Sequence, residues 1–364
     1  MASVFEGCLH GKIARKIVFN TLPGVFARDR VSSIESTMSS PAPSPVKQPR
    51  IATSFAPSLF DHQVNGFAGV DFQTLELSAE GLRRAVDALR ACQTHRILLT
   101  LITDEVDALC AKFKHIEELR ARDPMVSETV CGYHLEGPFL SGEDGYRGAH
   151  PAGLQCAPTS KAFKQIQSAA NGRIRMLTIA PELPGSAEFI AEVVQDGVVV
   201  SLGHTNATDA QIDAAIRAGA TLCTHVGNGV PQTMHRHDNI MQRLLARDEL
   251  TACFIPDGVH LPPAVLRNFF RAKPRGKVIF TTDAVSAAGA PPGKYTVGSI
   301  KVESKDGVVR QAGRKNFAGS CLTPDQGMLN AARWLNLSTS DARAMFSTQA
   351  AAHFRIGLPI IPIS

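Results

Sequence analysis

One glutamate and two histidines stand at the ends of short apolar runs that have the composition of strands. Glu136 comes just before a Gly-Pro pair, and His204 and His225 follow two later runs. A carboxylate and two imidazoles are ligands for divalent zinc or iron, and three protein ligands leave one coordination position for water. The sequence therefore predicts a catalytic rather than a structural metal site, with zinc or iron as the metal.

Two further side chains have the chemistry that a metal-dependent hydrolysis needs. Asp283 ends the last strand-like run and is expected to take a proton from water and deliver it to a leaving group. His260 follows the preceding run and is expected to donate a hydrogen bond to the oxyanion that develops on a scissile carbonyl. The alternative interpretation of Asp283 is a helix N-cap, a position that aspartate favours.

The elements that must position these residues alternate regularly from residue 58 onward. Each unit is a short apolar run, a polar cluster with glycine and a longer helical pattern such as 78–92, 105–120 or 208–218. Eight runs are expected to be strands: 58–64, 97–102, 129–135, 175–179, 198–202, 221–225, 251–255 and 278–282. Eight alternating units predict an α/β fold, the (β/α)8 TIM barrel, whose active site forms at the carboxyl ends of its strands.

Composition and charge exclude several classes of protein. The chain has 364 residues, of which 44% are hydrophobic and 20% charged, so it can bury a large core. The net charge of +5 comes mostly from residues 1–50, which contain seven basic and three acidic residues. The rest of the chain is nearly neutral, which argues against a nucleic-acid partner. Uncharged apolar runs stay shorter than the roughly 18 residues of a membrane-spanning helix, so no membrane partner is expected.

Cysteine usage indicates a reducing compartment. The eight cysteines are scattered and form no Cys-x-x-Cys pair. Disulfides are rare in the cytosol and structural zinc sites use closely spaced cysteines, so we expect free thiols in a cytoplasmic protein.

The first 56 residues are expected to lie outside the fold as a low-complexity tail. They lack sustained periodicity, and residues 39–50 are rich in Ser and Pro. Met38 precedes this stretch, and one hypothesis is that translation starts there, which would make residues 1–37 a gene-model artefact. Residues 57–364 are predicted to form the barrel, with a β-hairpin insertion at 294–311.

Seven segments resemble the amidohydrolase superfamily, and specifically the N-acetylglucosamine-6-phosphate deacetylase family. The most specific are HLEGPFLS at 134–141 and SLGHTNAT at 201–208. The others are DHQVNGFAGVDF at 61–72, THVGNG at 224–229, PDGVHLPP at 256–263, TTDAVSAAG at 281–289 and AGSCLT at 318–323. They occur in family order, so the resemblance covers nearly all of the predicted barrel.

The resemblance implies a hydrolase of amino-sugar metabolism that removes the N-acetyl group of a phosphorylated amino sugar, giving acetate and the free amine. It assigns roles to five strand-end residues: Glu136, His204 and His225 as metal ligands, Asp283 as acid/base and His260 as the contact that polarises the carbonyl. His150 matches a histidine of the family that contacts the sugar.

Positions 63 and 65 predict the number of metal ions. In many amidohydrolases the first strand ends in His-x-His and holds a second metal, whereas this chain has Gln63 and Asn65 there. The resemblance therefore favours one divalent ion per chain, with Gln63 and Asn65 among the substrate-binding residues.

The sequence departs from the family pattern in two regions. The small β-sandwich that usually accompanies the barrel is largely missing, because the residues before the first barrel strand are Pro-rich. After the sixth strand, Asn228 and Gly229 are expected to offer backbone N–H groups to the phosphate, with Arg236 as a positive donor. Family members commonly dimerise with a basic side chain reaching across to the phosphate, so a homodimer in which Arg236 acts on the partner's site is one arrangement.

Two other functions are compatible with the same residues. A related amidohydrolase would use this centre on a different N-acylated substrate, and a barrel that had lost activity would serve as a binding protein. The complete set of Glu136, His204, His225 and Asp283 argues against loss of activity.

Overall fold

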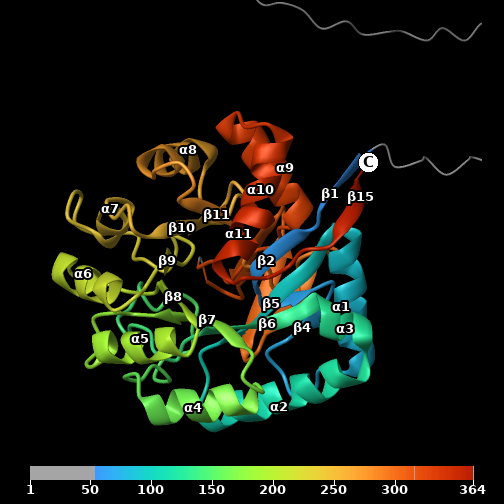
Figure 1. Cartoon of the computed structure of the whole chain (residues 1–364), viewed down its shortest axis with the longest axis horizontal. Helices are drawn as coiled ribbons and strands as arrows, with labels where there is room; N and C mark the ends of the chain where they lie inside the picture. The colour runs from blue at the N-terminus through green and yellow to red at the C-terminus, as the bar shows by residue number, and fades with distance from the viewer. Residues whose placement is uncertain (1–53, 315, 364) are drawn as a thin grey trace, which may run out of the picture. The chain divides into compact units, whose positions relative to one another are not determined.

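The barrel predicted from the sequence is present. The computed structural model describes residues 54–314 and 316–363. Eight parallel strands form one sheet, ordered as they follow one another along the chain: β2 (Leu59–Val64), β5 (Thr94–Ile102), β6 (Val130–Glu136), β7 (Ile174–Ile179), β8 (Val199–Leu202), β9 (Leu222–Cys223), β10 (Thr251–Phe254) and β11 (Val278–Phe280). Each overlaps the run predicted for it, and Figure 1 shows the helices placed around them. The (β/α)8 fold class is confirmed.

Hydrogen bonds between the first and last strands complete the circle. A parallel bridge joins the end of β2 to Ala284, just beyond β11, and the N–H of Asn65 donates to the Ala284 carbonyl at 2.7 Å. The buried carboxylate of Asp61 accepts a hydrogen bond from each of the Thr281 and Thr282 hydroxyls at 2.5 Å. The two strands are therefore tied together at their carboxyl ends, where the predicted site lies.

The helices begin where the sequence supplies caps. They are α1 (Ala79–Ala91), α2 (Val106–Arg122), α3 (Pro124–Thr129), α4 (Ser160–Ala169), α5 (Ser186–Gln195), α6 (Asp209–Arg217), α7 (Ile240–Leu245), α8 (Pro263–Ala272), α9 (Pro324–Leu335), α10 (Thr339–Met345) and α11 (Thr348–His353). The Ser78 hydroxyl caps α1, and Thr208 forms a capping box with Gln211 at the start of α6. Within the described ranges, every helix is too short or too polar to cross a membrane.

The amino-terminal end of the barrel is filled by apolar side chains. Inward-facing residues of six strands form one cluster: Phe60, Leu98, Met176, Leu222, Cys253 and Ile279. Helix α11 closes this end, because Ala350, Ala351 and Phe354 pack against the cluster. The barrel is therefore packed at this end, and the pocket formed by the described residues lies at its carboxyl end.

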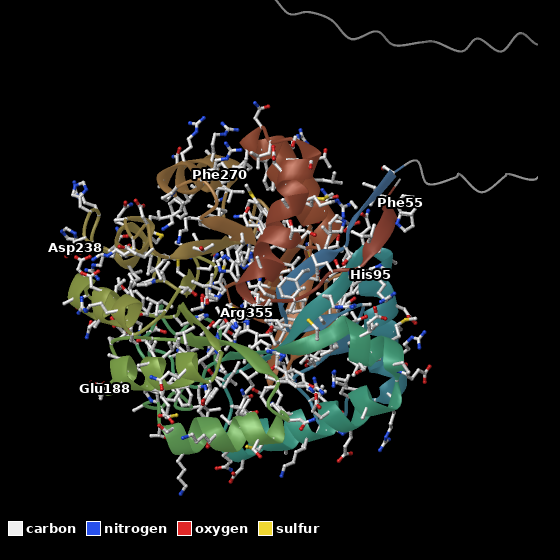
Figure 2. All side chains as sticks on the ribbon, viewed as in Figure 1. Phe55, His95, Glu188, Asp238, Phe270 and Arg355 are labelled. Atoms are coloured by element: carbon white, nitrogen blue, oxygen red, sulfur yellow. The ribbon has the colours of Figure 1, made fainter. Side chains whose placement is uncertain are left out.

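Small antiparallel sheets are added to the barrel. β1 (Ser54–Pro57) pairs with β15 (Ile360–Ile363), and Phe55 projects from β1 with 69% of its surface exposed (Figure 2). Residues 54–56, which the sequence analysis placed in the tail, therefore belong to the fold. Their pairing partner lies at the other end of the chain, where local composition does not reveal it. A short hairpin of β3 (Gly66–Phe67) and β4 (Val70–Asp71) follows β2.

The segment predicted to form a hairpin at 294–311 contains three strands instead of two. They are β12 (Gly293–Val297), β13 (Ile300–Lys305) and β14 (Val308–Gln311), paired in sequence order. The apolar face of this sheet, with Val297, Ile300 and Val302, packs against Val285 beside the barrel mouth. The expectations for residues 1–53, including the start at Met38, lie outside the described residues.

Candidate metal centre and active site

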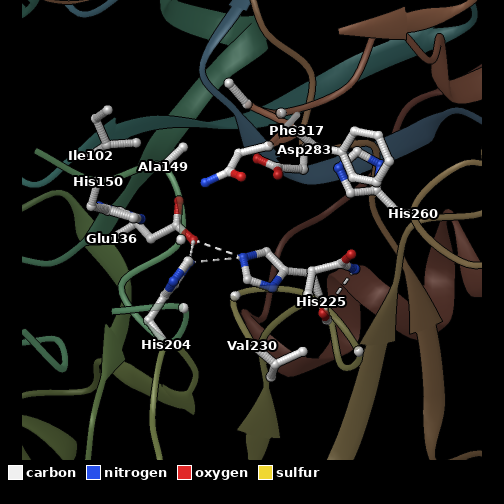
Figure 3. A pocket seen from close by; sticks show the side chains of 18 of the residues that line it. Ile102, Glu136, Ala149, His150, His204, His225, Val230, His260, Asp283 and Phe317 are labelled. Carbon is white, nitrogen blue, oxygen red and sulfur yellow. Dashed lines mark hydrogen bonds and ion pairs between the residues drawn. The ribbon is translucent and has the colours of Figure 1, made fainter. Parts of the chain in front are cut away.

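Three predicted ligands from different strands meet at the carboxyl end of the barrel. Glu136 is the last residue of β6, and His204 and His225 lie two residues beyond β8 and β9. Figure 3 shows their side chains pointing toward one another, although they are separated by up to 89 residues in the sequence. All three side chains are buried. The structure thus brings together the whole set that the strand ends suggested.

The spacing of the three ligand atoms fits a tetrahedral metal ion. Oε1 of Glu136 lies 3.0 Å from Nε2 of His225 and 3.3 Å from Nε2 of His204, and the two nitrogens are 3.2 Å apart. Ligand atoms about 2.0–2.1 Å from a tetrahedral zinc ion are separated by roughly 3.3–3.4 Å. These residues could therefore hold one divalent ion with little rearrangement.

The backbone of two ligands and of Asp283 adopts the left-handed conformation. The φ angles are 51° at His204, 27° at His225 and 50° at Asp283, and each residue lies where the chain leaves a strand. This conformation costs a residue with a side chain on the order of 1–3 kcal/mol, and it persists only where surrounding contacts hold it. The local turns thus direct these three side chains over the barrel axis at a cost in stability.

The ring of His204 is held by backbone groups on several sides. Its Nδ1–H donates to the Tyr146 carbonyl at 3.0 Å, which leaves the Nε2 lone pair for a metal. A Cβ atom on Gly148 would approach the ring to 3.0 Å, and one on Gly229 to 2.6 Å. Because of this close approach, a side chain at either position would displace the imidazole. Both glycines also have positive φ angles, a conformation that residues with a side chain rarely adopt.

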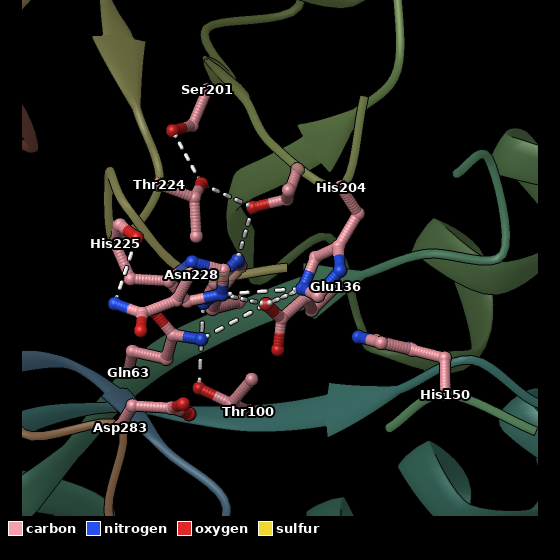
Figure 4. A network of polar contacts seen from close by, with 12 residues as sticks. Gln63, Thr100, Glu136, His150, Ser201, His204, Thr224, His225, Asn228 and Asp283 are labelled. Carbon is pink, nitrogen blue, oxygen red and sulfur yellow. Dashed lines mark hydrogen bonds and ion pairs between the residues drawn. The ribbon is translucent and has the colours of Figure 1, made fainter. Parts of the chain in front are cut away.

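A chain of hydroxyl groups lies beside the three predicted ligands. Ser201 bonds to Thr224 at 2.6 Å, Thr224 to Thr178 at 2.8 Å, and Thr178 to Nε2 of His134 at 2.7 Å. All four residues are buried (Figure 4). This network links the interiors of β6, β7 and β8 to the loop that carries His225, so the ligand-bearing strand ends are coupled to one another.

Gln63 and Asn65 each donate a hydrogen bond to a carboxylate of the site. Nε2 of Gln63 donates to Oε1 of Glu136 at 3.0 Å, and Nδ2 of Asn65 donates to Oδ1 of Asp283 at 2.7 Å. Both amides are predicted from the sequence to bind substrate. Asn65 does line the pocket, but Gln63 does not, because its amide turns toward Glu136 beneath the ligand atoms.

The two buried carboxyl groups have pKa values shifted in opposite directions because their neighbours differ. Burial by itself favours the protonated form of Glu136, but hydrogen bonds from His204 and His225 outweigh it and hold the pKa of this carboxyl well below its usual range. Burial, with Glu136 as a nearby negative charge, raises the pKa of Asp283 to about 8. One carboxylate is thus ready to bind a cation, and the other can carry a proton near neutral pH.

His260 lines the same pocket and is oriented by a residue that the sequence analysis gave no role. Its Nδ1 lies 2.6 Å from Oδ2 of Asp257, whose other oxygen accepts the backbone N–H of His260 at 2.8 Å. Nε2 is therefore the free ring nitrogen. Phe317 packs against the imidazole with ring centroids 5.1 Å apart. The signal for Asp257 was present as the Asp-x-x-His spacing of the PDGVHLPP segment.

The pocket above the ligands has a volume of about 730 Å³. His150, Asn228 and Gly229, which the sequence predicts to bind substrate, are among the residues that line it. The His150 ring lies 4.4 Å from the His204 ring, and its Nδ1 is 2.9 Å from Oγ1 of Thr103. Burial and the neighbouring His204 lower the pKa of His150 to about 3, so it faces the pocket as a neutral ring.

Arg236 does not reach this pocket in the single chain. Its side chain is exposed, and the pocket lining from the same loop comes from Gln232 and Met234 instead. Figure 2 shows Asp238, two residues further on, at the periphery of the molecule. Among the described residues of one chain, Arg236 therefore does not make the phosphate contact expected of it. The reason is that the loop that carries Arg236 turns outward. None of the described lining residues is Lys or Arg.

The fold and the site together define the class of the protein. A (β/α)8 barrel with a buried carboxylate and two imidazoles at its carboxyl end, and an aspartate after its last strand, is a barrel hydrolase of the amidohydrolase type. No family model matches the chain. Similar proteins are nevertheless found both by sequence and by structure.

An N-acetylglucosamine-6-phosphate deacetylase of Danio rerio is 35% identical over 289 residues, which are 74% of this chain and 68% of the relative. The human enzyme of the same name is 34% identical over 279 residues, which are 74% of this chain and 67% of the human protein. A mutant of the Mycobacterium smegmatis enzyme, solved in complex with N-acetyl-D-glucosamine-6-phosphate, superposes with a TM-score of 0.75 at 30% identity, covering 85% of this chain and 80% of that one. The chain belongs to the N-acetylglucosamine-6-phosphate deacetylase family, which confirms the resemblance stated above.

The raised pKa of Asp283 predicts how the stability of the metal-free protein depends on pH. The buried carboxyl keeps its proton up to a pH of about 8, whereas the unfolded chain releases it near 3.8. The metal-free protein therefore loses stability as the pH rises between these values, and Asp283→Asn, which stays neutral, removes this loss. Thermal melts of chelator-treated protein should show the variant as the more stable one at pH 8 and the difference shrinking toward pH 4. Parallel curves for the two proteins would contradict the assigned ionisation.

Proposed function

We propose that this chain removes the N-acetyl group of N-acetylglucosamine 6-phosphate by hydrolysis, giving glucosamine 6-phosphate and acetate. The observation that carries the proposal is the triangle of Glu136, His204 and His225 with Asp283 in the same pocket. Membership of the deacetylase family and the superposition on the ligand-bound M. smegmatis enzyme support it.

We propose one divalent ion per chain, zinc or iron, held by the Glu136, His204 and His225 triangle. When bound, such an ion supplies Lewis acidity, lowering the pKa of a water molecule and polarising a carbonyl. Gln63 and Asn65 are neutral amides already engaged with Glu136 and Asp283, so they support a single ion rather than a second one.

Asp283 would act as the acid/base in both halves of the reaction. As a carboxylate it accepts a proton from the water that attacks the carbonyl carbon of the acetyl group. It then delivers this proton to the amide nitrogen as the C–N bond breaks. A pKa raised by burial suits a group that must both accept and donate near neutral pH. Asp257 accepts from Nδ1 and keeps the His260 ring oriented, and Nε2 donates toward the carbonyl oxygen when the ring is the imidazolium, which carries a proton on both nitrogens.

The sugar phosphate would be held by groups beside His204. His150 faces the sugar as a neutral hydrogen-bonding group, and Gly229 lies on the loop after β9, where its N–H can meet a phosphate oxygen. The N–H of the neighbouring Asn228, which was also expected to meet phosphate, instead donates to the His225 carbonyl at 3.0 Å. The Arg236 side chain is exposed and does not line its own pocket, which supports the arrangement in which it contacts the phosphate of a partner subunit in a homodimer.

One observation favours the second candidate, a related amidohydrolase that acts on a different N-acylated substrate. Among the described residues that line the pocket, none is Lys or Arg, which is unusual for a site that binds a phosphate. A neutral amide would need no such cation. The two candidates share the metal centre and differ only in the group that the outer part of the pocket recognises.

We place the reaction in the cytoplasm. The seven cysteines that the structure describes are all free thiols, and burial raises the pKa of Cys223 to about 12, so this thiol stays protonated. Free, protonated thiols are typical of proteins that work in a reducing compartment.

Acetate release tests the proposed function directly. The metal-loaded protein should release acetate from N-acetylglucosamine 6-phosphate much faster than from N-acetylglucosamine, because the phosphate contributes binding energy that only the first substrate has. The measurement is kcat/KM for both sugars at the same metal content. Equal values for the two would favour the second candidate, and no release from either would refute the proposal.

Two substitutions separate the chemistry from metal binding. Asp283→Asn cannot accept a proton, so kcat should fall by roughly 10²–10⁴ while KM and metal content change little. Glu136→Gln should instead lower the metal occupancy, because an amide is a weaker ligand than a carboxylate. Turnover and elemental analysis on both variants check this. Near wild-type turnover by metal-loaded Asp283→Asn would show that Asp283 is only a cap.

Arg236→Ala tests phosphate recognition. Loss of a charge-assisted contact costs about 1.5–3 kcal/mol, which should appear mainly as a higher KM for the phosphorylated sugar, with little change for the free sugar. Steady-state kinetics on both substrates gives the comparison. If both substrates lost the same activity, Arg236 would be a structural residue rather than a phosphate contact.

A further inference from the structure

The turn after His204 is held by a carboxylate from the neighbouring strand's loop. Glu182 follows β7, and its Oε1 accepts the backbone N–H of Asn206 at 2.8 Å. Its other oxygen, Oε2, accepts the hydroxyl of Thr205 in a short hydrogen bond. Both donors lie within two residues of His204, and the Thr205 hydroxyl oxygen in turn accepts the N–H of Ala207 at 3.0 Å.

His204 needs such support because of its backbone. With a φ of 51° it occupies a conformation that an isolated residue of this type rarely adopts, so neighbouring groups must hold it. Apart from its ring contacts with Glu136, His225 and His150, His204 is held by backbone groups: its carbonyl accepts the N–H of Ser141, and its Nδ1–H donates to the Tyr146 carbonyl. Glu182 instead holds the next two residues, and it does so through a side chain with two charge-assisted hydrogen bonds.

We propose that Glu182 is a positioning residue that sets the metal affinity of the centre by holding the turn that carries His204. This role rests on the proposed metal site, and it adds Glu182 as a residue that affects the metal affinity without being a ligand. Loss of the carboxylate leaves the Thr205 hydroxyl and the Asn206 N–H without this acceptor, while the Asn206 side chain keeps a 3.3 Å hydrogen bond to Glu143. The left-handed turn then relaxes, and Nε2 of His204 leaves its place near Glu136 and His225. The ligands remain in the chain, but they are no longer arranged in advance for the ion.

The experiment measures the affinity for Zn²⁺ alone, by competition with a chelator, in the full-length metal-free protein. Glu182→Ala should weaken Zn²⁺ binding about 10–100-fold, the range typical of partners that orient metal ligands. Glu182→Gln should retain most of the affinity, because its carbonyl oxygen still accepts the Asn206 N–H and its amide can donate to the Thr205 hydroxyl.

Glu192→Ala is the matched control. Glu192 lies on α5, the helix after the Glu182 loop, and its carboxylate also accepts a hydroxyl, that of Ser160, while pairing with Lys164 at 2.7 Å. The Glu192→Ala variant therefore loses a hydrogen bond from a hydroxyl and an ion pair, but it leaves the contacts of the His204 turn unchanged. Its Zn²⁺ affinity should equal that of the wild type.

A Glu182→Ala protein that binds Zn²⁺ as tightly as the wild type, even with a lower melting temperature, would overturn the proposal. If this variant does not fold, Thr205→Val removes only the hydroxyl, and it should weaken Zn²⁺ binding by a smaller factor; an unchanged affinity there would equally overturn it. The proposed function fails separately, when wild-type protein binds Zn²⁺ but releases no acetate from the phosphorylated sugar.

Discussion

A carboxylate buried against two imidazoles is the constraint on which the rest of the structure depends. The ligand atoms of Glu136, His204 and His225 lie within 3.3 Å of one another and away from water. Burying a charged group without a compensating charge costs several kcal/mol, so this cluster is stable only with a cation or with shared protons. The barrel satisfies the constraint by bringing three strand ends to one point. The left-handed turns at His204 and His225 add a local cost that the fold must also bear.

Neutral amides keep the centre from accumulating further charge. Gln63 donates to Glu136, and Asn65 donates to Asp283, so each carboxylate receives a hydrogen bond without a new positive group. Imidazoles at these two positions would favour a second cation, and with it the ionised form of Asp283. The same β2 strand end is tied to the last strand through Asp61, which couples closure of the barrel to the geometry of the site.

The sequence predicted those parts of the molecule that depend on local patterns. Apolar runs with polar residues at their ends located all eight strands, and the strand ends located Asp283 and the three residues that could hold a metal ion. Contacts between loops far apart in the chain were not predictable in this way. Glu182 shows no local signal for its bonds to the turn after His204, and nothing in the residues around Arg236 indicates that its loop turns outward. The pairing of residues 54–57 with the last strand was missed for the same reason.

X-ray absorption at the metal edge, combined with elemental analysis of the Zn²⁺-loaded protein, tests the central claim that one ion is held by Glu136, His204 and His225. The expected result is one ion per chain, with nitrogen and oxygen neighbours near 2.0–2.1 Å and the scattering of two imidazoles. Glu136→Gln and His225→Ala should each diminish that shell. Two ions per chain with a metal–metal distance of about 3.5–4 Å, or sulfur in the first shell, would contradict it.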